Sequence, residues 1–174
     1  MDIGVAQAAA CTSRIIIEKV DSQTEEAIHA IAHFTAEHLH GYAIVDTGAT
    51  QSMTSVVQID WLQGALAEDL GYGRTLEADH SFKVNFTFAD GKSEGSVGCV
   101  GISHRCALPG DNGKIWFNML ENPKAPTLLG IQWLDKAGAT VDCSKGKLFF
   151  KSGTSHALQR LPSGHWALSL FGSE

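Results

Sequence analysis

The sequence predicts a mostly β fold with short helices, and three features support this class. Short runs of apolar, β-branched and aromatic residues recur along the chain and are separated by turn-forming segments rich in Gly, Asp and Asn. Only two long stretches, residues 22–40 and 55–70, repeat their apolar residues at helical spacing. A chain of 174 residues is long enough for one domain with a core of its own and too short for two.

Composition excludes several classes of function. Hydrophobic residues make up 44% of the chain and charged residues 18%, as in a soluble globular protein. The net charge of −6 argues against nucleic acid as the main partner, because phosphate binding requires clustered Lys and Arg. No apolar run approaches the roughly 20 residues of a membrane span, and we expect no signal peptide. The four cysteines form no Cys-x-x-Cys pair, which favours free thiols in a reducing, cytoplasmic compartment over disulfides or a zinc site.

Residues 1–40 are predicted to form an N-terminal extension with one strand and one helix. Residues 1–13 are small and irregular, which suggests a mobile tail or a remnant of a polyprotein. The β-branched run at 14–20 predicts a strand. Ser22-Gln-Thr-Glu25 is a capping-box sequence and predicts a helix that extends to about His40.

Four histidines lie on or at the end of this predicted helix and raise the question of a metal site. Two of them, His29 and His33, have the i, i+4 spacing that zinc can use. No glutamate lies between them in an HExxH arrangement, and the sequence offers no obvious third ligand. We therefore interpret the histidines as part of a solvated helix face and assign no metal.

The segment Gly41-Tyr-Ala-Ile-Val-Asp-Thr-Gly-Ala-Thr50 has an unusual composition. Its apolar run predicts a buried strand that stops at Asp46, where an unpaired buried carboxylate would be costly. Thr47 and Gly48 follow, and the glycine allows a tight turn and the close approach of other groups. A carboxylate held at a fixed point in this way can act as a general acid or base.

Four segments together resemble the retropepsin-like aspartic proteases, the family of retroviral and retrotransposon proteases. Residues 43–50 (AIVDTGAT) resemble the family's active-site loop, and residues 127–134 (TLLGIQWL) resemble the apolar-apolar-Gly segment that precedes its short C-terminal helix. Residues 86–98 are similar to the flap hairpin, and residues 139–150 resemble the closing strands of retrotransposon members. Order and spacing agree over residues 41–150, which we therefore predict to be a protease domain.

The resemblance implies a single-lobed closed β-barrel of the acid-protease type with short helices. The chain departs from the family before the active-site loop. Retropepsins usually reach this loop through a β-hairpin, whereas this chain is predicted to reach it through an extra N-terminal helix. The N-terminal contribution to any dimer is therefore left open.

The other elements of the expected domain follow from local patterns. Apolar residues from Val56 to Leu70 recur at helical spacing and predict a packing helix over 55–70. The hairpin turn contains Gly91 and Gly95, so we interpret the hairpin as a movable flap rather than an ordinary surface hairpin. The remaining predictions are a strand over 82–88, a turn over 89–95, a return strand from 97, a loop over 108–113, a strand over 114–120, a connector over 121–126, a helix over 131–136 and two short strands within 141–150.

Residues 151–174 are predicted to be a C-terminal extension. Several leucines together with Trp166 and Phe171 make this segment too apolar for a free tail. Three interpretations are open: the segment covers a sheet edge, contributes to a dimer contact, or forms a spacer toward the next part of a polyprotein.

The resemblance implies an aspartic endopeptidase that needs neither a metal nor another cofactor. Asp46, Thr47 and Gly48 match the family's catalytic residues. Pepsin-like enzymes carry two such loops in one longer chain, and this chain has one, so the second carboxylate must come from another copy in a two-fold symmetric homodimer. The implied substrate is the polyprotein of a retrotransposon, cleaved in the cytoplasm or within retrotransposon particles. The implied substrate-binding residues are Ala49, Thr50, Ala89, Asp90, Gly91, Lys92, Ser93, Leu129 and Gly130.

Other functions compete with this expectation. The first is a retropepsin-like module that dimerises or binds partners but no longer cuts peptides. The second is a metal-dependent hydrolase that uses the histidines. A serine hydrolase is disfavoured, because the chain has no Gly-x-Ser-x-Gly segment and Ser103 and His104 are merely adjacent.

Overall fold

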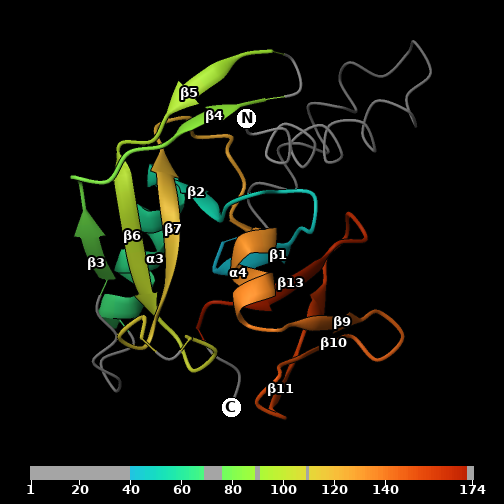
Figure 1. The fold of residues 1–174 in the computed structure, drawn as a ribbon. Helices are drawn as coiled ribbons and strands as arrows, with labels where there is room; N and C mark the ends of the chain where they lie inside the picture. The colour runs from blue at the N-terminus through green and yellow to red at the C-terminus, as the bar shows by residue number, and fades with distance from the viewer. Residues whose placement is uncertain (1–39, 69–75, 89–90, 109, 172–174) are drawn as a thin grey trace.

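The computed structural model describes residues 40–68, 76–88, 91–108 and 110–171 (Figure 1). The predicted strand over 14–20 and all but the last residue of the predicted helix over 22–40 lie outside these ranges. Within them the chain is mostly β with few helices, which confirms the predicted class. In chain order the elements are β1 (Tyr42–Val45), β2 (Met53–Ser55), α3 (Val56–Glu68), β3 (Leu76–Asp79), β4 (Asn85–Thr87), β5 (Ser93–Gly95), β6 (Gly98–Ser103), β7 (Lys114–Leu120), β8 (Leu128–Leu129), α4 (Ile131–Lys136), β9 (Thr140–Asp142), β10 (Lys147–Phe149), β11 (Ser155–Ala157), β12 (Gln159–Arg160) and β13 (Trp166–Ser169).

Most strands belong to one eight-stranded sheet with the order β12-β13-β1-β8-β2-β7-β6-β3. A three-stranded sheet has the order β11-β10-β9, and β4 and β5 form a separate hairpin, which projects at the top of the molecule in Figure 1. Within the described part of the chain, the two end strands β12 and β3 do not pair with each other. Both end strands are largely exposed, so the expected closed barrel is not formed there, and the main sheet keeps two edges.

Two parallel pairings organise the centre of this sheet. β1 runs parallel to β8, with Val45 opposite Leu129, and β2 runs parallel to β7, with Thr54 opposite Met119. β8 also meets β2 in the antiparallel sense at Met53. Parallel neighbours cannot be joined by a tight hairpin. The chain must therefore cross over between them, and the crossings bring the segment around β8 next to the loop that follows β1.

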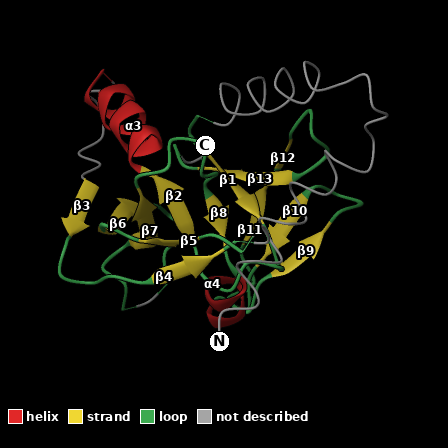
Figure 2. Ribbon diagram, turned by 90° about the horizontal axis from the view of Figure 1, so that it is seen from above, coloured by secondary structure: helices red, strands yellow, loops and turns green. Residues whose placement is uncertain are grey.

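The core consists of two buried clusters on either side of β1. Ala43 belongs to one cluster and Ile44 to the other, because successive side chains of a strand point to opposite faces. The helices α3 and α4 contribute to the first cluster through Leu62 and Leu134, and Figure 2 shows strands of the main sheet between these helices. Phe86 of the β4–β5 hairpin belongs to the second cluster and is completely buried.

The C-terminal part of the chain is integrated into the main sheet. β13 pairs antiparallel with β1, with Leu168 opposite Ala43. Leu168 and Leu170 are buried in the first cluster, and Leu161 is buried in the second. Of the three interpretations of residues 151–174, the structure supports the one in which this segment covers a sheet edge, since β13 occupies the side of β1 that β8 leaves open.

Most local predictions agree with the structure, and the differences have a physical reason. The strand over 114–120 and the helix over 131–136 are found as predicted, and the helix over 55–70 is found as α3. The predicted strand over 82–88 is shorter, since only Asn85–Thr87 are extended and paired. β3 was not predicted, because three of its four residues are exposed and two of those are acidic, so it lacks an apolar pattern.

Replacing Leu168 with alanine tests whether β13 is part of the fold. Leu168 is 2% exposed, so the change should lower the free energy of unfolding by roughly 2–5 kcal/mol. Urea denaturation measures this difference, and Gln159→Ala, at an exposed position of β12, serves as the control with little change expected. Equal stability of the Leu168 variant and the parent protein would contradict the assignment.

Candidate active site

Backbone hydrogen bonds fix the loop that follows β1. The N–H of Asp46 donates to the carbonyl oxygen of Leu129 at 3.1 Å, which extends the parallel pairing of β1 and β8 by one residue. The N–H of Ile131 donates to the carbonyl of Ala49 at 2.7 Å, and the N–H of Gln132 donates to the carbonyl of Thr50 at 3.2 Å. The loop is therefore held at its start by β8 and at its end by the first turn of α4.

The Asp46 carboxylate is half-buried, and one of its oxygens has a defined partner. The backbone N–H of Gly48 donates to Oδ1 of Asp46 at 2.8 Å. Among the residues that the structure describes, the second carboxylate oxygen accepts no hydrogen bond. The carboxylate is thus oriented by its own loop, and one oxygen is left available for a water, a substrate or another carboxyl group.

Gly130 packs closely against Gln51, near the end of this loop. A Cβ atom at Gly130 would lie 2.4 Å from the carbonyl carbon of Gln51, which is backbone and cannot move aside easily. The N–H of Gly130 donates to the hydroxyl of Ser52 at 3.1 Å, and Ser52 is itself buried. The glycine of the apolar-apolar-Gly segment is therefore required here for space.

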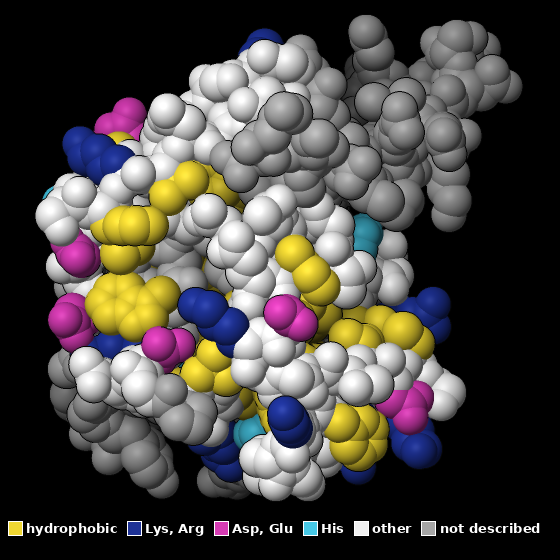
Figure 3. Space-filling model, viewed as in Figure 1, with side chains coloured by type: hydrophobic (Ala, Val, Ile, Leu, Met, Phe, Trp, Pro, Cys, Tyr) yellow, Lys and Arg dark blue, Asp and Glu magenta, His cyan; other side chains and the backbone are white. Residues whose placement is uncertain are grey.

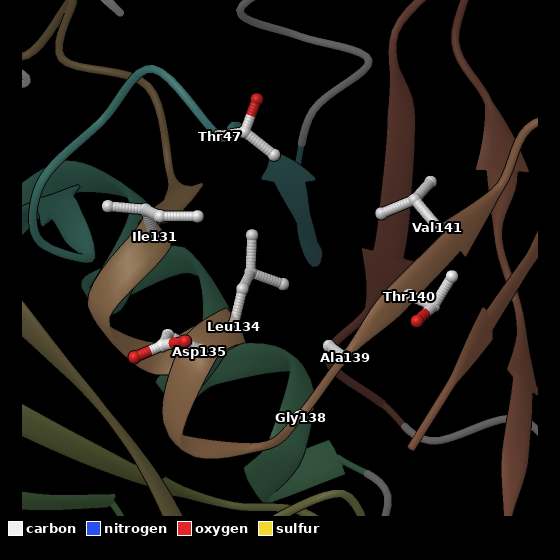
Figure 4. A pocket seen from close by; sticks show the side chains of 8 residues that line it. All are labelled: Thr47, Ile131, Leu134, Asp135, Gly138, Ala139, Thr140 and Val141. Atoms are coloured by element: carbon white, nitrogen blue, oxygen red, sulfur yellow. The ribbon is translucent and has the colours of Figure 1, made fainter. Parts of the chain in front are cut away.

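Thr47 lies beside an open hollow. Its side chain is exposed, and it lines a hollow of about 370 Å³ together with residues of α4 and of the chain into β9. Figure 4 shows Ile131, Leu134 and Val141 directed toward the space below Thr47. The full lining is Thr47, Ile131, Leu134, Asp135, Gly138, Ala139, Thr140 and Val141. The hollow thus adjoins the loop of Asp46 through Thr47.

The β4–β5 hairpin is shorter than the predicted flap. Its return strand is β5, which lies inside the segment predicted as a turn over 89–95, and the return strand expected from 97 is β6, which pairs with β7 and β3 in the main sheet instead. Its turn is closed by hydrogen bonds from the N–H of Phe88 to the carbonyl of Lys92 at 2.8 Å and from the N–H of Gly91 to the carbonyl of Phe88 at 2.9 Å. Gly91 has a φ of 79°, which favours glycine. Ala89 and Asp90 lie outside the described residues.

The structure brings some of the predicted substrate-binding residues together and separates others. Ala49, Leu129 and Gly130 lie in or beside the Asp46 loop but are buried, so they support the loop instead of lining an open surface. Thr50 is half-buried. By contrast, the hairpin residues Gly91, Lys92 and Ser93 are exposed on an element that lies outside the main sheet.

Sequence reasoning missed several buried polar residues beneath the loop. The hydroxyls of Thr54 and Thr127 share a hydrogen bond of 2.7 Å in the interior. The side-chain amide nitrogen of Asn118 donates to the side-chain oxygen of Gln51 at 3.1 Å and to the carbonyl of Ser52 at 3.0 Å. Isolated polar residues inside apolar strands were the available signal, but their partners lie more than sixty positions away in sequence.

Asp142, next to Val141 of the hollow, carries a stable negative charge. The hydroxyl of Ser144 donates to its carboxylate at 2.6 Å, and the N–H of Lys145 donates at 3.0 Å. These hydrogen bonds, together with the nearby Lys145 ammonium group, lower the pKa of Asp142 from 3.8 to about 2. This carboxylate therefore stays ionised over nearly the whole acidic range.

The described residues also bear on two other classes of protein, metal-binding and membrane-spanning. Among the described residues, no group of three or more His, Cys, Asp or Glu side chains is placed to hold a metal ion. The described helices are all too short or too polar to cross a bilayer. Cys99, Cys106 and Cys143 are free thiols, and burial raises the pKa of the Cys106 thiol to about 12.

No model of a known protein family matches this chain, and no curated protein matches it. What the chain does is therefore inferred from its residues and their arrangement.

Replacing Gly130 with alanine should destabilise the site without changing its polar groups. The added methyl group would overlap the backbone of Gln51, so we expect a loss of at least about 1–3 kcal/mol in unfolding free energy. Gly64→Ala in α3 is the matched control, since a Cβ there meets no atom within 4 Å and should stabilise the helix by about 0.5–1 kcal/mol. Thermal denaturation of both variants measures the contrast, and similar effects at the two glycines would be inconsistent with a space requirement.

Asp142→Asn should show a stability effect that depends on pH. The folded pKa lies below the ordinary value of 3.8, so the ionised group stabilises the folded turn above that pH, and this contribution is lost as pH falls from 3.8 to about 2. We expect the melting temperature of the variant to lie below that of the parent protein at pH 5 and the two to converge near pH 2. A difference that persists unchanged at pH 2 would rule out this carboxylate as its source.

Proposed function

We propose that this protein is a retropepsin-like aspartic endopeptidase that acts as a homodimer. The observation that carries the proposal is the carboxylate of Asp46, which stands at the end of a buried strand with one oxygen held by the N–H of Gly48. A loop fixed on both sides by backbone hydrogen bonds supports it, because a catalytic group is effective only when its position is preorganised.

Two copies of Asp46 would supply the chemistry together. Two carboxyl groups a few ångströms apart cannot both ionise cheaply, so the pair holds one proton and titrates as a unit. The ionised member takes a proton from a water held between the two, and this water attacks the carbonyl carbon of the scissile peptide bond. The protonated member donates to the carbonyl oxygen, and the tetrahedral intermediate collapses without a covalent bond to the enzyme.

The neighbouring residues have supporting roles in this proposal. Thr47 is exposed in a single chain, so its hydroxyl is available to brace the loop of the second copy. Gly48 holds the Asp46 carboxylate and lets the backbone approach the substrate. The β4–β5 hairpin closes over an extended peptide, which binds as an added strand. We propose a retrotransposon polyprotein as substrate and the cytoplasm as the place of cleavage.

The variant Asp46→Asn tests the proposal. The amide cannot take a proton from water, so the cleavage rate of an apolar-rich peptide library should fall by at least about a hundredfold. Asp60→Asn, at an exposed carboxylate of α3, is the matched control and should cleave like the parent protein. Sedimentation of both variants checks that the dimer persists, and mass spectrometry of the products measures cleavage.

Each outcome of this test has a defined meaning. A parent protein that dimerises but cuts no peptide over pH 3–7 would replace the enzyme with a dimerisation or binding module. Cleavage that survives in Asp46→Asn would reject the catalytic role of this residue. Activity of the parent protein that is abolished by excess chelator would favour a metal-dependent hydrolase.

A further inference from the structure

Positive charge is concentrated in the C-terminal part of the chain. Residues 143–171 contain four Lys and Arg residues and no Asp or Glu, whereas the rest of the chain holds nine Lys and Arg and all nineteen Asp and Glu. The net charge of −6, which argues against nucleic acid as the main partner, averages over this difference. The four cations are Lys145, Lys147, Lys151 and Arg160, and all are exposed. Figure 3 shows Lys and Arg side chains at the lower right of the molecule, where Figure 1 places β9, β10 and β11.

The strand β10 turns one basic and one aromatic side chain to the solvent. It is the central strand of the three-stranded sheet β11-β10-β9. Leu148 is completely buried, and successive side chains of a strand point to opposite faces, so Lys147 and Phe149 lie together on the outer face. Thr140 and Ser155, which pair with Phe149 on either side, are small and exposed. The half-buried ring of Phe149 therefore has no large side chain opposite it on either neighbouring strand.

Cations lie close to this ring and to a second ring nearby. The ammonium nitrogen of Lys145 is 5.9 Å from the centre of the Phe149 ring, and the guanidinium carbon of Arg160 is 5.7 Å from the centre of the Trp166 ring. The two groups adjoin at Gly146, where a Cβ atom would lie 2.9 Å from the Trp166 ring. Basic and aromatic side chains thus alternate over one continuous region.

Most of this positive charge is not neutralised within the protein. Lys145 pairs with Asp142 at 3.3 Å. Among the described residues, Lys147, Lys151 and Arg160 form no ion pair with a carboxylate. Fixed cations of this kind attract an external polyanion. Three cations are therefore available to a partner.

We propose that the outer face of the three-stranded sheet, with Arg160 and Trp166 at its border, binds single-stranded nucleic acid. Proteins that bind single strands combine cations that contact the phosphates with aromatic rings on which the bases stack. Here Phe149 offers the stacking surface, and the three unpaired cations contact the phosphates. A duplex keeps the faces of its bases within its own stack. An acidic peptide would satisfy the cations and leave the rings without a role. No residue of the Asp46 loop takes part, so this binding does not depend on the proposed function.

Fluorescence anisotropy of the full chain with labelled oligouridylate and oligothymidylate tests the proposal. Probes of about 20 nucleotides exceed the roughly 4–16 nucleotides that a domain covers in binding of this kind. The logarithm of the association constant should fall against the logarithm of the salt concentration with a slope of about −2, because each of three phosphate contacts contributes about −0.7 on a single strand. Binding of either probe with this slope supports the proposal, and the comparison of the two shows whether RNA or DNA is preferred.

Two variants separate stacking from charge. Phe149→Leu keeps an apolar side chain but removes the ring, so it should weaken binding by at least about fivefold with an unchanged salt slope. Lys147→Gln removes one phosphate contact and should bring the slope closer to zero by about 0.7. Phe82→Leu and Lys124→Gln are the matched controls, since Phe82 is 55% exposed, Lys124 is exposed, and both lie outside this sheet. Circular dichroism melting checks that each variant is folded.

Each outcome has a defined meaning. Weaker binding in both sheet variants and parent-like binding in both controls supports the proposal. A parent protein that binds neither probe at about 50 mM salt overturns it. Equal weakening in the controls would show unspecific attraction and also overturns it. Binding that is unchanged in Phe149→Leu and displaced by polyglutamate would replace nucleic acid with an acidic protein as the partner. If Phe149→Leu does not fold, the salt slope of Lys147→Gln against that of Lys124→Gln decides.

Discussion

The position of Asp46 depends on hydrogen bonds between two backbone segments that lie far apart in the sequence. The residues around β8 accept from Asp46 and donate to the loop after it, through Leu129 and Ile131. Gly130 between them has no side chain and packs directly on the backbone of Gln51. Main-chain atoms make these contacts, and the side chains of Asp46 and Ser52 add hydrogen bonds to the N–H groups of Gly48 and Gly130. Thr47 is the exposed residue of this loop, while Ala49 is completely buried.

The two sides of the candidate site differ in how firmly they are held. Beneath the loop, buried hydroxyl and amide groups such as Ser52 and Asn118 connect β2 to β7 and to the start of α4. On the other side, the β4–β5 hairpin lies outside the main sheet, and it inserts one completely buried side chain, Phe86, into the core. The hairpin is thus anchored to the core mainly through Phe86, whereas the loop is held by hydrogen bonds within the main sheet and to α4.

Local patterns in the sequence predict the elements whose residues alternate or repeat clearly. The strand over 114–120 and the helix over 131–136 are of this kind, and so is the buried strand that ends at Asp46. β3 was not predicted, because most of its residues are exposed, two are acidic, and it therefore lacks an apolar pattern. The pairing of β13 with β1 could not be predicted, because the local sequence of a strand does not determine which distant strand it pairs with. The same limit applies to the hydroxyl pair of Thr54 and Thr127. The hollow beside Thr47 is likewise visible only once the chain has folded.

The place of β1 in the sheet also affects how the protein can be made in a cell. Both neighbours of β1, the strands β8 and β13, come much later in the chain. A ribosome adds roughly 5–20 residues per second, so this early strand waits several seconds for its partners to emerge. The loop that carries Asp46 thus takes its final shape only after the residues of β8 and β13 have been synthesised.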